Sequence, residues 1–212
     1  MNEEQAVLDF FARDENLPLG LSVAERMDKL REQMNNRYWR ELQQRLVASF
    51  KADGLAWQVE FTEDKNASES LVGLHCKARP EQDIYLRPMI EQQYLGGEWR
   101  IYFGLMWSAA PSPDHLGAAA VCNLKESLLL SGFKNNASFL AWQWTRFYPR
   151  RRDFLLRYAR EPEILLGETG TILKTLLIDH SDSIALANSA LRSAPRSTAI
   201  SLDRLRSKRS SD

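Results

Sequence analysis

Apolar residues recur at every third or fourth position through residues 27–50. This spacing places them on one face of an α-helix, and that face must pack against another part of the protein. We expect the helix to span residues 22–52, because Ser22 and Glu25 form a capping box and Gly54 is a common helix terminator. The recurring positions are Met27, Leu30, Met34, Tyr38, Leu42, Leu46 and Phe50.

The apolar period changes to two directly after this helix. Alternation of apolar with polar or small residues is typical of a β-strand that has one buried face. The dipeptide Gly96-Gly97 suits a tight hairpin turn, because glycine accepts positive φ. We therefore expect an antiparallel meander within residues 55–107, which a later strand at 139–147 extends. The expected strands of the meander begin at Leu55 and cover residues 55–61, 71–77, 83–95 and 99–107.

The remaining segments are expected to be helical and to cover one side of the sheet. A short acidic helix at 4–13 precedes the long helix, another follows the sheet at 114–131, and helices fill residues 150–192. The result is an α+β fold, a four- to five-stranded antiparallel sheet with helices packed on one side, in a single domain of residues 1–192. The basic tail 193–212 has few apolar residues and is expected to be disordered.

The segment Gly167-Glu168-Thr169-Gly170 is expected to interrupt the last helical region. Its GxxG spacing is similar to that of the loop with which KH domains clamp nucleic-acid backbone. Glu168 would repel phosphate, so we interpret the segment as a plain capping loop. In that interpretation a glycine ends one helix and Thr169 caps the next.

Composition indicates a globular protein of ordinary character. The chain has 212 residues, 44% of them hydrophobic, and a formal net charge of zero. Its acidic start differs from a secretory leader, and its apolar runs are too short to span a membrane. Cys76 and Cys122 lie in apolar surroundings without CxxC spacing. We therefore expect two reduced, buried thiols in a cytoplasmic protein that does not bind membranes.

Positive charge is concentrated between Trp142 and Arg160, where six arginines face a single acid, Asp153. Guanidinium groups pair with carboxylates and phosphates and stack on aromatic rings. They can equally join a helix to a sheet, because arginine stems pack on aromatic side chains. The candidate binding residues are Arg146, Arg150, Arg151, Arg152, Arg157, Arg160, Trp142 and Trp144.

These residues lead to the hypothesis of a non-enzymatic binding protein that contacts either an acidic protein partner or nucleic acid. The arginines would position acidic groups of the partner. Trp142 and Trp144 share one face of the expected strand, and we expect them to hold the following helix to the sheet. A small-molecule pocket between the sheet and the long helix is a further possibility.

The alternative hypothesis is a divergent metal-dependent nuclease. The order of expected elements, which is helix, several strands, helix and strand, resembles that of the PD-(D/E)XK nuclease core. Such enzymes hold a divalent metal with acids from neighbouring strands. The nearest candidates are Asp64 with Lys77, where His75 stands in the position of the second acid, and Asp83 with Glu91, which are far apart along a strand. We therefore expect no catalytic site, metal site or cofactor.

Overall fold

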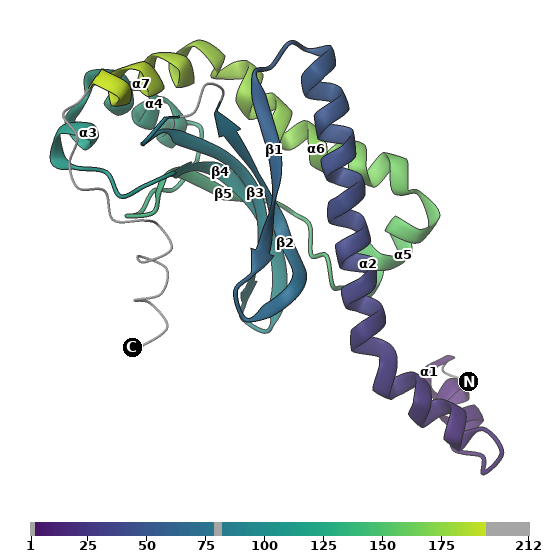
Figure 1. Ribbon diagram of the computed structural model, residues 1–212. Helices are drawn as coiled ribbons and strands as arrows, with labels where there is room; N and C mark the ends of the chain where they lie inside the picture. Colours follow the sequence, from purple (N-terminus) through teal and green to yellow (C-terminus); the bar gives the residue numbers. More distant parts are fainter. Residues whose placement is uncertain (1–2, 79–81, 194–212) are drawn as a thin grey trace.

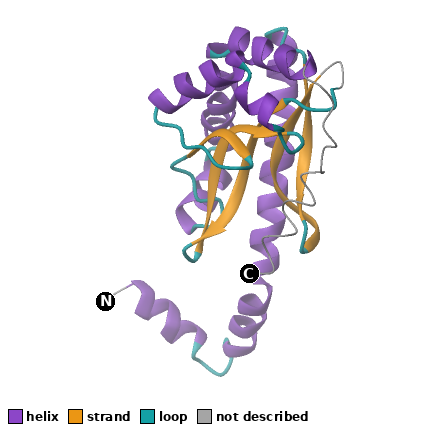
Figure 2. Ribbon diagram, turned by 90° about the vertical axis from the view of Figure 1, so that its left-hand side faces the viewer, coloured by secondary structure: helices purple, strands orange, loops and turns teal. Residues whose placement is uncertain are grey.

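The computed structural model describes residues 3–78 and 82–193, and its elements are shown in Figures 1 and 2. Two helices precede four consecutive strands, and a fifth strand lies among the later helices. In chain order the elements are α1 (Glu3–Phe11), α2 (Leu17–Ala52), β1 (Trp57–Asp64), β2 (Ala67–Ala78), β3 (Leu86–Leu95), β4 (Glu98–Trp107), α3 (Pro113–Gly117), α4 (Ala119–Leu130), β5 (Phe139–Trp144), α5 (Arg152–Arg160), α6 (Pro162–Asp179) and α7 (Ser181–Ser193).

The five strands form one antiparallel sheet in the order β1-β2-β3-β4-β5. The expected meander is therefore confirmed. Gly96 and Gly97 both have positive φ and join β3 to β4 in the expected hairpin. Beyond the end of β5, Thr145 N donates to Ile101 O, which extends the pairing with β4.

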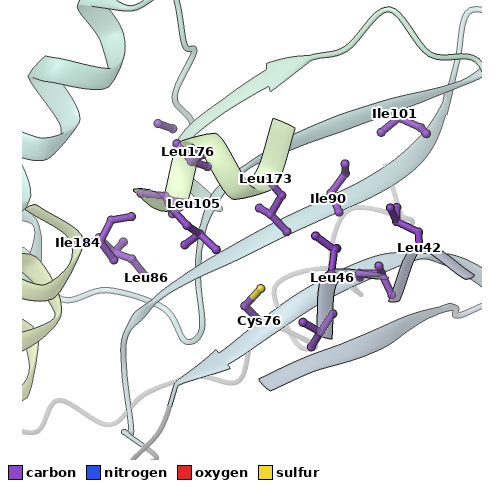
Figure 3. Close-up of a cluster of buried hydrophobic side chains, with 14 of the residues drawn as sticks. Leu42, Leu46, Cys76, Leu86, Ile90, Ile101, Leu105, Leu173, Leu176 and Ile184 are labelled. Atoms are coloured by element: carbon purple, nitrogen blue, oxygen red, sulfur yellow. The ribbon is translucent and has the colours of Figure 1, made fainter. Parts of the chain in front are cut away.

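The main core lies between one face of this sheet and the helices. Leu42 and Leu46 of α2 are buried there beside Leu173 of α6 and Ile90 of β3, as Figure 3 shows. Helices α2, α4, α6 and α7 all contact the sheet on this side. The α+β class, with helices on one side of an antiparallel sheet, is confirmed.

Helix α2 begins five residues earlier than expected, at Leu17 instead of Ser22. Pro18 lies in its first turn, where a missing N–H costs nothing because the first helical N–H groups have no intrahelical acceptor. The segment around Pro18 therefore forms the first turn of α2 and is not an irregular segment ahead of the helix. The earlier start carries α2 beyond the sheet, with α1 beside its first turns (Figures 1 and 2).

Helix α6 runs without interruption through Gly167-Glu168-Thr169-Gly170, so the expected capping loop is wrong. The first residue after this helix is His180, where the backbone leaves the helical region. Both glycines face neighbouring side chains of α2. A Cβ on Gly170 would lie 3.6 Å from Leu42 Cδ1 and Leu46 Cδ2, and one on Gly167 would lie 3.2 Å from Arg45. Contact with α2 stabilises a helix that glycine propensity alone disfavours.

Smaller differences concern boundaries. The helix expected at 114–131 is divided into α3 and α4 at Ala118, whose backbone is extended. The strand expected at 139–147 ends at Trp144. The tail that we expected to be disordered lies outside the described residues from 194 onward. Cys76 is buried as expected, but Cys122 is only partly buried. Within the described ranges, no helix is both long and apolar enough to cross a membrane.

Candidate binding surface

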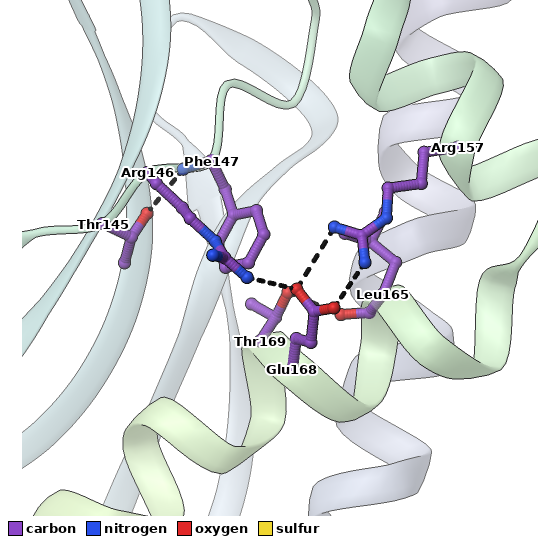
Figure 4. Close-up of polar contacts among 7 residues, drawn as sticks. All are labelled: Thr145, Arg146, Phe147, Arg157, Leu165, Glu168 and Thr169. Atoms are coloured by element: carbon purple, nitrogen blue, oxygen red, sulfur yellow. Dashed lines mark hydrogen bonds and ion pairs between the residues drawn. The ribbon is translucent and has the colours of Figure 1, made fainter.

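Two of the candidate arginines share one carboxylate. Arg146 Nη2 lies 2.7 Å from Glu168 Oε2, and Arg157 contacts both oxygens of Glu168, as Figure 4 shows. Hydrogen bonds from Arg157 and Arg146 keep the pKa of Glu168 below its ordinary value. Because α6 is continuous, Glu168 stands on a rigid helix beside α5 and the loop after β5. These two arginines are therefore paired within the chain.

Arg151 and Arg150 point to different surroundings. Arg151 donates to Glu98 through two of its guanidinium nitrogens, Nη2 and Nε, and Nε lies 2.7 Å from Oε1. The Arg151 guanidinium also lies 3.9 Å from the centroid of the Tyr148 ring. Both side chains of this ion pair are partly exposed. Arg150 is half-buried with its guanidinium 4.4 Å over Trp99, and burial lowers its pKa. Arg151 can thus reach an external group, whereas Arg150 mainly packs.

Arg152 and Arg160 are exposed and have no ion pair among the described residues. Arg152 is the first residue of α5 and Arg160 is its last. Carboxylates outside the two ion pairs also act on these arginines: Asp153 on Arg151, Glu161 on Arg157, and Glu32, Asp64 and Asp28 on Arg150. Acids from other elements therefore offset part of the positive charge of this stretch of sequence.

Trp142 and Trp144 lie on the face of the sheet opposite the main core. Trp144 pairs with Tyr102 across β4 and β5, and Trp142 pairs with Gly104, whereas Ile101 alternates to the core face. The expectation that the tryptophans hold the following helix to the sheet is wrong, since their strand phase turns them away from the helices. They form a second apolar cluster with Met89, Tyr102, Met106 and Phe139.

This side of β5 carries a row of cations and aromatic rings in contact with each other, which we call the cation–aromatic strip. Its ring centroids lie 5.4 Å apart for the two tryptophans, and each cation lies within 3.9 to 5.7 Å of a ring centroid. Such contacts are individually worth about 0.5–1 kcal/mol at exposed sites. In order along the row, the strip consists of Lys134, Trp142, Trp144, Arg100, Tyr148 and Arg151.

A network of hydrogen-bonded polar side chains crosses the same face of the sheet and was not among the predicted sites. Buried Glu91 accepts hydrogen bonds from Thr62 Oγ1 and Tyr102 Oη, both at 2.9 Å. Thr62 Oγ1 also lies 3.0 Å from His75 Nδ1, and His75 Nε2 lies 3.5 Å from Glu60. Burial, with a smaller effect of the nearby Arg87 charge, lowers the pKa of His75.

The sequence feature that indicates this network is the set of polar residues that alternate with apolar residues along the strands. Glu60 and Thr62 alternate with the apolar residues of β1, and the register then places them opposite His75 and Gly73. Gly73 in turn lies opposite Glu91 on β3. The register across three strands was required to see that these residues meet, and spacing within one strand does not supply it.

The carboxylates considered for a nuclease do not form a metal site in the described part of the chain. Among residues 3–78 and 82–193, no group of three or more His, Cys, Asp or Glu side chains is arranged to hold a metal ion. Glu60 and Glu91 approach the same His75–Thr62 pair from two sides. The carboxylate of Asp64 accepts a hydrogen bond from the backbone N–H of Asn66, in the turn after β1.

No protein-family model, curated protein or solved structure matches this chain. The candidate surface is therefore judged on its own geometry.

Proposed function

We propose that this chain is a non-enzymatic binding protein that holds an acidic segment of a partner protein on the cation–aromatic strip. The observation that carries the proposal is the pairing of Arg151 with Glu98. A guanidinium group at the end of the strip binds a carboxylate through two nitrogens while both side chains stay partly exposed. A carboxylate from a partner can take the place of Glu98 in the same geometry.

Exchange of this kind is energetically accessible. Exposed ion pairs contribute about 0–1 kcal/mol, so displacing Glu98 costs little. The rings of Trp144 and Tyr148 stay beside Arg100 and Arg151 whichever carboxylate is bound, and they supply apolar contact area to the partner. Arg152, which follows directly on α5, adds a second exposed cation.

Nucleic acid fits the strip less well than an acidic protein segment. Single-stranded nucleic acid binds by stacking bases on uncovered aromatic faces. Here Lys134 lies over Trp142 and Arg100 over Trp144, so these ring faces are already occupied. Glu98 lies beside the strip and would repel a phosphate backbone. A carboxylate-bearing segment needs only the cations, which are accessible.

The direct test compares binding of a labelled glutamate-rich peptide with binding of a single-stranded oligonucleotide of equal charge. Replacing Arg151 and Arg152 by glutamine should weaken peptide binding about tenfold, which corresponds to roughly 1.4 kcal/mol. The double replacement of Arg13 and Arg40, which are exposed elsewhere, removes the same charge and should change binding little. Fluorescence anisotropy at about 50 and 200 mM salt separates the contribution of charge.

A second variant tests the exchange itself. Glu98→Gln removes the competing carboxylate while keeping the size of the side chain, so it should tighten peptide binding several-fold. If the Arg151–Glu98 pair only supports the fold, this variant will bind no better than the wild-type protein. Equal peptide binding by wild-type protein and the Arg151/Arg152 variant, or a stronger response to the oligonucleotide, would reject an acidic protein segment as the ligand.

A further inference from the structure

Helix α1 and the first part of α2 form a helical hairpin that projects from the rest of the described chain. In Figures 1 and 2 this hairpin lies beyond the end of the sheet, away from the other helices. We call residues 3–31 the arm. Its two helices contact each other. Hydrogen bonds from α2 to β2 come from residues after the arm, Asn35 to Leu71 O and Asn36 to Glu69 O.

The arm has a defined geometry of its own. A Cβ on Gly20 would lie 3.0 Å from the ring of Phe11, so the two helices approach closely at this point. Asn16 Nδ2 donates to Phe10 O at 3.0 Å and fixes the turn between the helices. The hairpin is therefore ordered before any partner binds, which lowers the entropic cost of association.

Large apolar side chains are exposed on the arm at unusual density. Burial of such residues is the main driving force of association, and contiguous apolar patches on a monomer commonly mark an interaction site. Each of the arm residues concerned is between 42% and 64% exposed. They are Val7, Leu8, Phe10, Leu17, Leu19, Leu21, Val23 and Leu30.

The exposed stripe on α2 continues the stripe that packs on the sheet. Leu19, Val23, Met27 and Leu30 follow the same spacing of three or four as Met34 and the buried positions after it. Within the described chain the sheet covers this face only from about Met34 onward, so Leu30 remains 48% exposed. A helix-spaced stripe of this kind packs against another helix.

We propose that the partner of the arm is the arm of a second copy of this chain, so that two helical hairpins pack antiparallel as a four-helix bundle. Two helical hairpins supply the four helices of such a bundle, and a two-fold axis lets each stripe cover its equivalent. Eight large apolar side chains of each copy, each 42% to 64% exposed, would contribute to an interface that needs roughly 800 Å² per partner to be stable.

Charge favours this arrangement. The sequence of α1, EEQAVLDFF, has three acids and no basic residue. The part of α2 in the arm has one more base than acid, with Arg26, Lys29 and Arg31 against Glu25 and Asp28. Arg26 lies three residues after Val23 and four before Leu30, which places its cation beside the apolar stripe. In the antiparallel bundle α1 of one copy lies against α2 of the other, and its acids meet this base. A membrane is a poor alternative, because interfacial helices that bind anionic lipid are rich in Lys and Arg.

The inference is independent of the strip, because none of the strip residues lies in the arm. If both proposals hold, the dimer carries two strips and binds a partner with two acidic segments more tightly than a monomer does.

Sedimentation velocity of the full chain over a range of concentrations tests the proposal. The wild-type protein should form a dimer. Leu19→Glu combined with Leu30→Glu should weaken dimerisation at least tenfold, since both charges enter the stripe. The matched control combines Leu130→Glu and Leu186→Glu, at sites that are 90% and 64% exposed outside the arm. The control should remain dimeric, and circular dichroism should show that every variant stays folded.

Several outcomes would overturn the proposal. These are a wild-type monomer at about 100 μM, where interfaces of standard size are normally populated, a trimer or larger assembly, and a dimer that survives the arm substitutions. A fourth is binding of wild-type monomer to vesicles of phosphatidylcholine and phosphatidylglycerol, because it would assign the stripe to lipid. None of these results bears on peptide binding by the strip.

Discussion

Replacing Gly170 by alanine separates the two interpretations of the Gly167–Gly170 segment. In the structure Gly170 is buried in the middle of α6 and has a helical backbone. Its new Cβ would meet Leu42 Cδ1 and Leu46 Cδ2 at 3.6 Å, which is ordinary van der Waals contact. The site can therefore accept a methyl group without moving α2.

The size of the effect follows from two contributions. Alanine is favoured over glycine by about 1 kcal/mol in a helix interior. A newly buried methyl group adds up to about 0.8 kcal/mol. We expect Gly170→Ala to raise the free energy of unfolding by about 1 to 2 kcal/mol. If the segment were a capping loop, Gly170 would be the first residue after the Thr169 cap, where the new methyl group would stay in solvent, and alanine would change the free energy of unfolding little.

Urea unfolding followed by far-UV circular dichroism measures this difference. With a slope of about 1–3 kcal/mol per molar urea, the midpoint should rise by roughly 0.3 to 2 M at unchanged slope. Gly132→Ala is the matched control, because Gly132 has φ of +85° and an added Cβ would lie 3.9 Å from Gln143 Nε2, without a clash. That variant should lose stability from backbone strain alone. A free energy of unfolding that stays unchanged or falls in Gly170→Ala would refute the continuous helix.

Two further predictions concern titratable groups. The pKa of His75 in the folded protein lies below its ordinary value of 6.5. As the pH falls, the unfolded chain therefore binds a proton at His75 before the folded protein does. The free energy of unfolding decreases between pH 6.5 and the lower pKa of the folded state. Urea unfolding at about pH 7.5 and 5.5 measures this decrease in the free energy of unfolding, and His75→Gln should make it smaller. If the decrease is the same in the variant, other titratable groups cause it. Burial raises the pKa of the Cys76 thiol, whereas Cys122 is partly accessible. Thiol labelling of native protein should therefore modify one cysteine, and Cys122→Ser should abolish it; labelling that persists in this variant would contradict the burial of Cys76.

The helical and strand periods of the sequence predicted the elements that depend on burial of one face. The stripe from Met34 to Phe50 and the alternation in residues 57–61 each require a partner surface, and the structure supplies it as the sheet and the helices on it. The hairpin at Gly96-Gly97 was predictable because positive φ is a local requirement.

The interpretation of residues 167–170 failed because it used local propensity only. Two glycines near a threonine favour a helix end in isolation. In the protein, Thr169 Oγ1 donates to Leu165 O within the helix, and α2 packs closely on Gly170. Tertiary contact thus outweighed the propensity of these residues, and the sequence around the segment carries no sign of that contact.

Which arginines remain accessible to a partner could not be predicted from the sequence, for a related reason. The window from Trp142 to Arg160 contains one acid, yet the carboxylates that pair with its arginines come from outside it. They are Glu98 at the start of β4 and Glu168 on α6. Net charge within a window therefore overstates how much charge a partner meets. What distinguishes the two carboxylates is their setting. Glu168 is held by two arginines on a packed helix, whereas Glu98 has one exposed partner at the end of the cation–aromatic strip. We therefore expect an acidic segment to displace Glu98 from Arg151, at the end of the strip, and to leave Glu168 paired with Arg146 and Arg157.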